Sequence, residues 1–187
     1  MRLAFVLVLL SACGGASPVS TPDSGINARA EYPAGPYGKM TGSVIANLEF
    51  QSPDGTTLAL RDVFKDESNK LLLITTGAGW CTACIEEQPA LKNLHTQWNA
   101  RGLVILESLF ENASFEPADA MLVNNWKTQY ATNFIVVGDA PNVLGAYYDK
   151  SLAPMNMFVD LTDMKILRVA TGYDANAIEA IITARLQ

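Results

Sequence analysis

The sequence has little positive charge and few of the residues that build metal sites. Its 13 Lys and Arg residues stand against 19 Asp and Glu residues, so the formal net charge is −6. Nucleic-acid binding depends on basic patches that neutralise phosphates, and no basic run occurs in this chain. Histidine occurs once, as His95, which excludes zinc sites made of several imidazoles and mechanisms that need two of them. We therefore set aside nucleic-acid partners, and the three cysteines become the residues to explain.

Long hydrophobic runs are also missing. The apolar run at residues 3–10 has eight residues, whereas a helix that crosses a bilayer needs about 20. The run follows Arg2, and a short apolar run behind a positive start is typical of an export signal peptide. It ends in Leu-Ser-Ala-Cys, with the cysteine at Cys13, and this motif resembles the lipobox of bacterial lipoproteins. The alternative is an ordinary signal peptide cut near Ala12 or Ala16, with Cys13 incidental.

The lipobox resemblance implies removal of residues 1–12 and lipidation of Cys13, which becomes the first residue of the mature chain. Three attached acyl chains anchor a protein stably, because each buried methylene contributes about 0.8 kcal/mol. We therefore predict an exported protein that is bound to a bacterial membrane through its lipid and faces the periplasm or the exterior. In enteric-type sorting an Asp after the cysteine retains a lipoprotein at the inner membrane, so Gly14 favours the outer membrane.

The rest of the chain divides into a linker and one domain. Small residues, Pro and Ser dominate residues 14–25, and such a composition buries too little side chain to offset its ordering entropy. We predict a flexible tether over residues 13–39 and a single domain over residues 40–187. Hydrophobic residues make up 49% of the sequence and charged residues 17%, which is enough apolar material for a core.

The domain alternates strand and helix patterns, which predicts an α/β fold around a largely buried sheet. A hairpin with a Pro-Asp-Gly turn is expected over 47–60, and residues 71–76 form an apolar run typical of a strand buried on both faces. A helix follows over 82–100, and Pro89 should kink it because proline lacks a backbone N–H. Further strands are expected over 103–106, 134–137, 155–159 and 166–170, and further helices over 117–130, 142–148 and from 174 onward.

Cys81 and Cys84 lie where the first core strand meets its helix, and their spacing allows three interpretations. A zinc site needs two more ligands, and only His95 and carboxylates remain to supply them. A structural disulfide would close a very short loop, where the gain in chain entropy is smallest. A redox pair fits best, since the start of a helix stabilises a thiolate at Cys81 and Cys84 lies one turn deeper. Export strengthens this interpretation, because a dithiol outside the cytosol can cycle against partner thiols.

The segment around the cysteines resembles the thioredoxin fold, because a strand leads into Trp-Cys-Thr-Ala-Cys at residues 80–84 and Pro89 follows five residues later. The hairpin and the segment 110–130 resemble the extracytoplasmic redoxins. These are membrane-tethered, thioredoxin-like thiol-disulfide oxidoreductases, several of which act in cytochrome c maturation. The resemblance covers residues 43–186, and it implies a central mixed sheet flanked by helices, with an N-terminal hairpin and a helical insertion.

Matched residue by residue, the resemblance implies roles for four side chains. Cys81 corresponds to the attacking thiol, Cys84 to the resolving thiol, and Trp80 to the aromatic residue that covers the site. Pro154 corresponds to the proline that shapes the peptide-docking groove and keeps metals off the thiols, and its bond to Ala153 is expected to be cis. The implied function is exchange of a Cys81–Cys84 disulfide with protein thiols and disulfides, without a cofactor or metal. The alternative is a non-enzymatic copper or thiol-metal chaperone on the same fold.

The sequence departs from the thioredoxin pattern around the cysteines. The buried acid of thioredoxin, six residues before the first cysteine, corresponds to Thr75, which cannot accept a proton from Cys84. Glu86 and Glu87 lie nearby, but we expect them to be solvated on an early helical turn. We expect Cys81 to be exposed and Cys84 to be shielded. The Thr-Ala dipeptide between the cysteines is neither the Gly-Pro of reducing thioredoxins nor the His-containing pair of oxidants, so the direction of electron flow stays open.

Competing chemistries on this fold depend on a few other positions. Ala78 stands where a peroxiredoxin with Pro-x-x-x-Thr-x-x-Cys has its threonine, which argues against that type of peroxidase. His95 is expected to be a partly exposed helix residue rather than a copper ligand. Met155 and Met157 alternate along one strand, and we favour core packing for them over Cu(I) binding.

Overall fold

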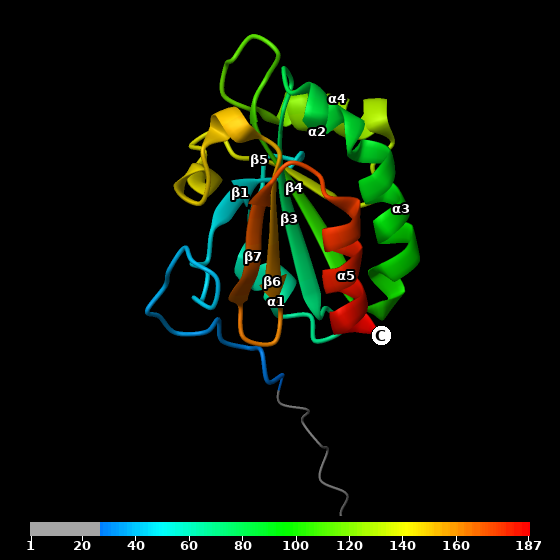
Figure 1. Cartoon of the computed structure of the whole chain (residues 1–187). Helices are drawn as coiled ribbons and strands as arrows, with labels where there is room; N and C mark the ends of the chain where they lie inside the picture. The colour runs from blue at the N-terminus through cyan, green and yellow to red at the C-terminus, as the bar shows by residue number, and fades with distance from the viewer. Residues whose placement is uncertain (1–26) are drawn as a thin grey trace, which may run out of the picture.

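A seven-stranded mixed sheet organises residues 27–187, the part of the chain that the computed structural model describes (Figure 1). The strands are β1 (Glu49–Gln51), β2 (Thr57–Ala59), β3 (Leu71–Ala78), β4 (Leu103–Glu111), β5 (Ile135–Gly138), β6 (Met155–Asp160) and β7 (Lys165–Thr171), in the spatial order β2-β1-β5-β4-β3-β6-β7. β3, β4 and β5 are parallel, β6 is antiparallel to β3, and β7 is antiparallel to β6. The predicted mixed sheet and N-terminal hairpin are confirmed. The predicted signal peptide and Cys13 lie outside the described residues.

Helices cover both faces of this sheet (Figure 1). They are α1 (Leu60–Phe64), α2 (Thr82–Glu86), α3 (Gln88–Trp98), α4 (Ala120–Tyr130) and α5 (Ala175–Leu186), with 3-10 turns η1 (Asn99–Arg101), η2 (Val143–Ala146) and η3 (Lys150–Leu152). In the part of the chain described by the structure, no helix is long and apolar enough to cross a membrane.

Side-chain alternation along β3 builds two cores. Leu71 and Leu73 point to the face that α3, α4 and α5 cover, whereas Leu72 and Ile74 point to the face that α1 and η2 cover. All four side chains are at most 1% exposed. The period of two in a strand therefore explains why this run is apolar at every position, as expected for a strand with both faces buried.

The helix predicted over 82–100 is divided into α2 and α3 at Glu87. Pro89 is the second residue of α3, and its missing N–H leaves the carbonyl of Ile85 without the usual donor four residues later. The chain turns at this point, so the structure has two separate helices where the sequence predicted one kinked helix. The turn brings Glu87 into the protein, where the residue is 3% exposed.

Several helices and strands begin or end at other residues than the sequence predicted. The helix expected from residue 117 begins at Ala120, because Asp119 caps it and residues 117–118 lie extended beside the end of β4. The strand expected over 103–106 continues to Glu111, and the short helix expected over 142–148 is the 3-10 turn η2. The five-residue helix α1 was not predicted, since it is too short to show a clear apolar period.

Residues 27–39, which belong to the predicted tether, lie against the domain. The Tyr32 ring packs at 5.7 Å from the Phe64 ring, and its hydroxyl donates to the carbonyl of Ile45. The guanidinium of Arg29 donates to the carbonyl of Asn69. These contacts fasten the segment beside α1.

Candidate redox site

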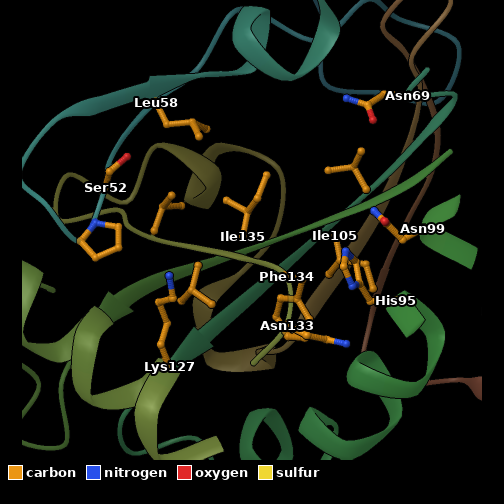
Figure 2. Close-up of a pocket in the computed structure, with 14 residues that line it drawn as sticks. Ser52, Leu58, Asn69, His95, Asn99, Ile105, Lys127, Asn133, Phe134 and Ile135 are labelled. Atoms are coloured by element: carbon orange, nitrogen blue, oxygen red, sulfur yellow. The ribbon is translucent and has the colours of Figure 1, made fainter. Parts of the chain in front are cut away.

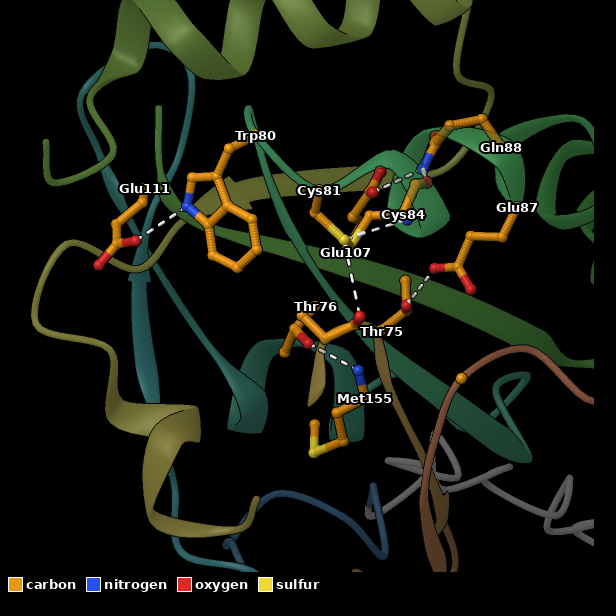
Figure 3. Close-up of a disulfide and its surroundings, with 12 residues drawn as sticks. Thr75, Thr76, Trp80, Cys81, Cys84, Glu87, Gln88, Glu107, Glu111 and Met155 are labelled. Carbon is orange, nitrogen blue, oxygen red and sulfur yellow. Dashed lines mark hydrogen bonds between the residues drawn. A yellow bond between two sulfur atoms is a disulfide. The ribbon is translucent and has the colours of Figure 1, made fainter. Parts of the chain in front are cut away.

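The two cysteines form a disulfide at the end of β3. The strand ends at Ala78, the chain turns through Trp80, and Cys81 is the N-cap of α2. The Cys81 and Cys84 sulfurs are bonded, with the Cα atoms 5.3 Å apart (Figure 3). The backbone N–H of Cys84 also donates to Cys81 Sγ over 3.1 Å. The start of a helix therefore presents a donor to the sulfur that the sequence analysis assigned to attack.

The cysteines are less accessible than the sequence suggested. Cys84 is fully buried, as expected, but Cys81 is only 4% exposed, so the prediction of an exposed Cys81 is wrong. The reason is that Cys81 belongs to a small apolar cluster with Phe110, against which Trp80 and Ala153 pack. Of the two sulfur-bearing residues, Cys81 is still the one nearer to solvent.

Trp80 is held beside the disulfide by three neighbours. Its indole N–H donates to Glu111 Oε2 over 2.9 Å, and its ring meets the Phe110 ring edge-on at 5.9 Å. The ring of Phe115, which is 66% exposed, stacks on it at 5.5 Å. Glu111 also pairs with Lys150 in η3, and hydrogen bonding by that ammonium lowers the pKa of the carboxyl. Glu111 thus links Trp80 to η3, the segment before β6.

The bond between Ala153 and Pro154 is cis, as predicted. The carbonyl oxygen of Ala153 lies 3.7 Å from Cys81 Sγ, so this backbone borders the disulfide. The next residue, Met155, donates its N–H to the hydroxyl of Thr76, which fixes β6 against β3 at this end (Figure 3). The structure therefore brings Trp80, Pro154 and both cysteines together, as the resemblance implied.

A polar row crosses three adjacent strands beneath α2 and α3. Thr75 of β3 pairs with Glu107 of β4 on one side and with Asn156 of β6 on the other. All three occupy the strand positions that alternate onto the helix-covered face, in line with Leu73 and Ile105. Side chains of paired residues on neighbouring strands lie close together, so this row gathers polar groups inside an apolar layer.

Glu87 reaches this row from the break between α2 and α3. Its Oε1 accepts from the Thr75 hydroxyl over 2.7 Å, and its Oε2 accepts from the Asn156 amide over 3.4 Å. Burial raises the pKa of Glu87 to about 7. The expectation that Glu87 is solvated is therefore wrong, because the Pro89 break turns it inward, whereas Glu86 is exposed as predicted.

Glu107 is a second carboxyl on the same face, and it is fully buried. Its Oε1 accepts from Gln88 Nε2 over 2.7 Å, and its Oε2 accepts from Trp126 Nε1 over 2.9 Å. The same amide of Gln88 donates to the carbonyl of Cys84 over 3.0 Å. Burial, followed by the nearby charge of Glu87, raises the pKa of Glu107 to about 8. Glu107 was not among the site residues predicted from the sequence, although an acid inside the apolar run 103–110 was a signal.

Position 75 lacks the carboxyl that thioredoxin has there, and Glu87 places a carboxyl beside this position instead. Thr75 itself cannot take a proton, but it hydrogen-bonds Glu87, which lies three residues after Cys84. Residues three apart on helical backbone are surface neighbours. A carboxyl with a pKa near neutrality is suited to accept and return a proton, so the site contains a candidate base for Cys84.

The other candidate residues take structural roles. His95 lies on α3, partly exposed against the ring of Phe134, as predicted. Met155 and Met157 are fully buried in the core, which confirms packing as their role. Within residues 27–187, no three His, Cys, Asp or Glu side chains converge as a metal site would require.

A groove of about 440 Å³ lies along β5, between the β1–β2 hairpin and helices α3 and α4 (Figure 2). His95, Lys127 and Asn133 contribute polar groups to it. Neither cysteine and neither buried glutamate lines this groove. The groove is therefore separate from the disulfide at the end of β3.

Comparisons with known proteins identify the fold. No protein-family profile and no curated protein matches the chain. Among solved structures, a putative thiol:disulfide interchange protein DsbE from Chlorobium tepidum has a TM-score of 0.66 and 18% identity, with 80% of this chain and 100% of that chain covered. The pneumococcal exposed lipoprotein thioredoxin from Streptococcus pneumoniae has a TM-score of 0.59 and 22% identity, with 74% and 99% covered.

A secreted disulfide oxidoreductase from Mycobacterium tuberculosis is also similar, with a TM-score of 0.55 and 16% identity, covering 74% of this chain and 96% of that chain. These identities are low, so the similarity shows the fold. The chain therefore has a thioredoxin-like fold, with a disulfide-bonded Cys-x-x-Cys pair at the position where its first core strand meets a helix.

Proposed function

We propose that the protein is a thiol-disulfide oxidoreductase that exchanges its Cys81–Cys84 disulfide with partner proteins. The observation that carries this proposal is the disulfide at the start of α2, bordered by the Ala153 carbonyl and backed by the buried carboxyl of Glu87. A disulfide kept only for stability needs no buried base to exchange a proton with its inner sulfur. Structural neighbours described as disulfide oxidoreductases support the same function.

In the direction that oxidises the protein, the reaction has two exchange steps. The Cys81 thiolate attacks one sulfur of a partner disulfide, a Cys81–partner bond forms, and the other partner sulfur leaves as a thiolate. Cys84 then gives its proton to the Glu87 carboxylate and attacks Cys81 Sγ, which releases the second partner thiolate and closes the Cys81–Cys84 bond. Reduction of the protein runs the same steps in reverse, with the proton returned to Cys84.

The order of the two thiols follows from burial. Cys81 is 4% exposed and receives the Cys84 N–H, whereas Cys84 is fully buried. A partner sulfur must therefore approach Cys81, against which Trp80 and Ala153 pack. Trp80 and Pro154 are proposed to shape this approach without exchanging electrons.

The proposal includes a place in the bacterial envelope. The supporting features are the export-type apolar run over 1–12, the lipobox cysteine Cys13 and the composition of the tether over 13–39. One structural neighbour is described as an exposed lipoprotein and another as secreted, which agrees with this location. We propose lipid anchoring through Cys13, with the outer membrane favoured by Gly14.

A redox titration of the full chain tests the proposed function. The protein is equilibrated with glutathione buffers of graded potential, and the free thiols are alkylated and counted by mass spectrometry. A reversible two-electron transition confined to Cys81 and Cys84 supports the proposal. A pair that never exchanges, together with one bound equivalent of Cu(I), would instead favour the metal-chaperone alternative.

A further inference from the structure

Two buried carboxyls share the face of the sheet beneath α2 and α3, and the mechanism above uses only one of them. Glu87 and Glu107 are 3% and 0% exposed. They are linked through Thr75, which donates to Glu87 and is the strand neighbour of Glu107. They are also linked through the helix, because Gln88 follows Glu87 and donates to Glu107. Through Thr75 and Gln88, the two carboxyls are therefore connected on the same face of the sheet.

No positive charge balances this pair. The hydrogen-bond donors to the carboxyls are Thr75, Asn156, Gln88 and Trp126, all of them neutral. Among residues 27–187, neither carboxyl takes part in an ion pair. Two carboxylates that are buried close together without a cation do not both ionise readily.

The titratable groups that face the pair are also uncharged near neutral pH. Burial raises the pKa of Tyr130 in α4, and the charge of Glu107 adds to this rise. Burial likewise raises the pKa of Tyr173, ahead of α5, and the charges of Glu87 and Glu179 add to it. From α2, the Cys84 carbonyl accepts from the same Gln88 amide that donates to Glu107, and β5 contributes the apolar Val136 beside Glu107. Among residues 27–187, the other carboxyls near this pair, Glu86 and Glu179, are exposed to solvent, so the two glutamates are the buried acids of this layer.

The two carboxyls differ in their access to solvent. Glu87 lines an open groove of about 290 Å³ together with Ala83, Glu86 and Tyr173. Glu107 is sealed between β3, β4 and α4, and a Cβ atom at Gly77 would already come within 3.1 Å of its Oε1. Protons can therefore enter and leave the pair through Glu87.

We propose that Glu107 is a positioning residue for the Cys84 step, because its carboxyl and that of Glu87 titrate as one coupled pair that holds a single proton around neutral pH. This inference rests on the proposed exchange function. When the pair holds one proton, one of its groups is a carboxylate, which can accept the proton of the Cys84 thiol. The other is a carboxylic acid, which can resupply the proton that is given to the Cys84 thiolate. Because of Glu107, Glu87 can return a proton to Cys84 up to a higher pH.

Coupling makes a prediction that does not depend on which carboxyl holds the proton. The wild-type pair loses its two protons at two separate pH values. The second proton leaves at the higher pH, because its loss creates two carboxylates that repel each other. Either single variant, Glu87→Gln or Glu107→Gln, leaves one carboxyl without that repulsion. Its single step should fall at least about one pH unit below the upper wild-type step.

The test is a carboxyl ¹³C NMR titration of the oxidised full chain. Two separated steps in the wild type, and one lowered step in each single variant, support coupling. Asp139, a buried carboxyl that caps η2, provides a control, since Asp139→Asn should leave both steps in place. An upper step that stays at the same pH in Glu87→Gln would overturn the proposal, because the carboxyls would then titrate independently.

Two further measurements can also refute the proposal. If Glu107→Gln does not fold, Trp126→Phe retains both carboxyls and removes one donor to Glu107, so it should move the upper step to higher pH. In the reduction of the protein by a dithiol, the alkaline limb of the pH–rate profile should move to lower pH in Glu107→Gln. The titration needs no exchange activity, so coupled carboxyls in an inactive protein would refute only the proposed function.

Discussion

Burial of Glu87 should make the stability of this protein fall as the pH rises. Burial raises the pKa of Glu87 from 4.5 to about 7. The unfolded chain therefore loses this proton near pH 4.5, while the folded protein keeps it until about pH 7. Between these values the unfolded state binds fewer protons, so the free energy of unfolding declines. At about 1.4 kcal/mol per pH unit, the decline due to this group is about 3 kcal/mol.

The variant Glu87→Gln removes this dependence, because an amide stays neutral throughout. We expect the free energy of unfolding of the variant, relative to wild type, to increase by at least about 3 kcal/mol between about pH 4 and about pH 8, because the neutral amide at this position also lowers the pKa of Glu107. Urea denaturation of both proteins at the two pH values measures the difference, and any constant cost of altered hydrogen bonds cancels.

The neighbouring residue provides a matched control for this experiment. Glu86 is exposed on the same turn, so Glu86→Gln should leave the pH dependence unchanged. A relative stability of Glu87→Gln that is the same at both pH values would refute the burial argument. It would mean that Glu87 ionises in the folded protein as readily as in the unfolded chain.

Three other substitutions test the anchor, the turn and the core. Cys13→Ser should move the protein from the membrane fraction to the soluble envelope fraction or block its processing, and recovery of soluble wild type with an unmodified Cys13 would contradict lipidation. Gly79→Ala should lower the free energy of unfolding by about 1–3 kcal/mol, measured in urea, because the added methyl group would collide with the backbone nitrogen of Ala113. Leu73→Ala should cost about 2–5 kcal/mol in the same assay, because this side chain is fully buried between the sheet and its helices.

Local sequence patterns were sufficient for the frame of the fold. The apolar run that became β3, the Pro-Asp-Gly hairpin and the cysteine spacing each depend on residues close together in the chain. The break at Pro89 also follows from one missing N–H. The cis bond at Pro154 was expected from the resemblance, because that position matched a fold whose geometry was already known.

The buried carboxyls of the site could not be predicted in this way. Glu87 is buried because a helix break turns it toward Thr75 and Asn156, which come from two different strands. Glu107 is buried because β4 continues past the segment where its strand was expected to end. The low exposure of Cys81 likewise depends on contacts distant in sequence. Each of these features is set by tertiary packing rather than by local pattern.

The central claim, that Cys81 attacks and Cys84 resolves, is tested most directly by trapping a mixed disulfide. Reduced full-length Cys84→Ser and Cys81→Ser are each incubated with glutathione disulfide near neutral pH, and peptide mass spectrometry locates the modified cysteine over time, which distinguishes it from Cys13. The account predicts that glutathione accumulates on Cys81 in the Cys84→Ser variant, while the buried Cys84 of the Cys81→Ser variant is modified far more slowly. Equal rates in the two variants, or faster modification through Cys84, would contradict it.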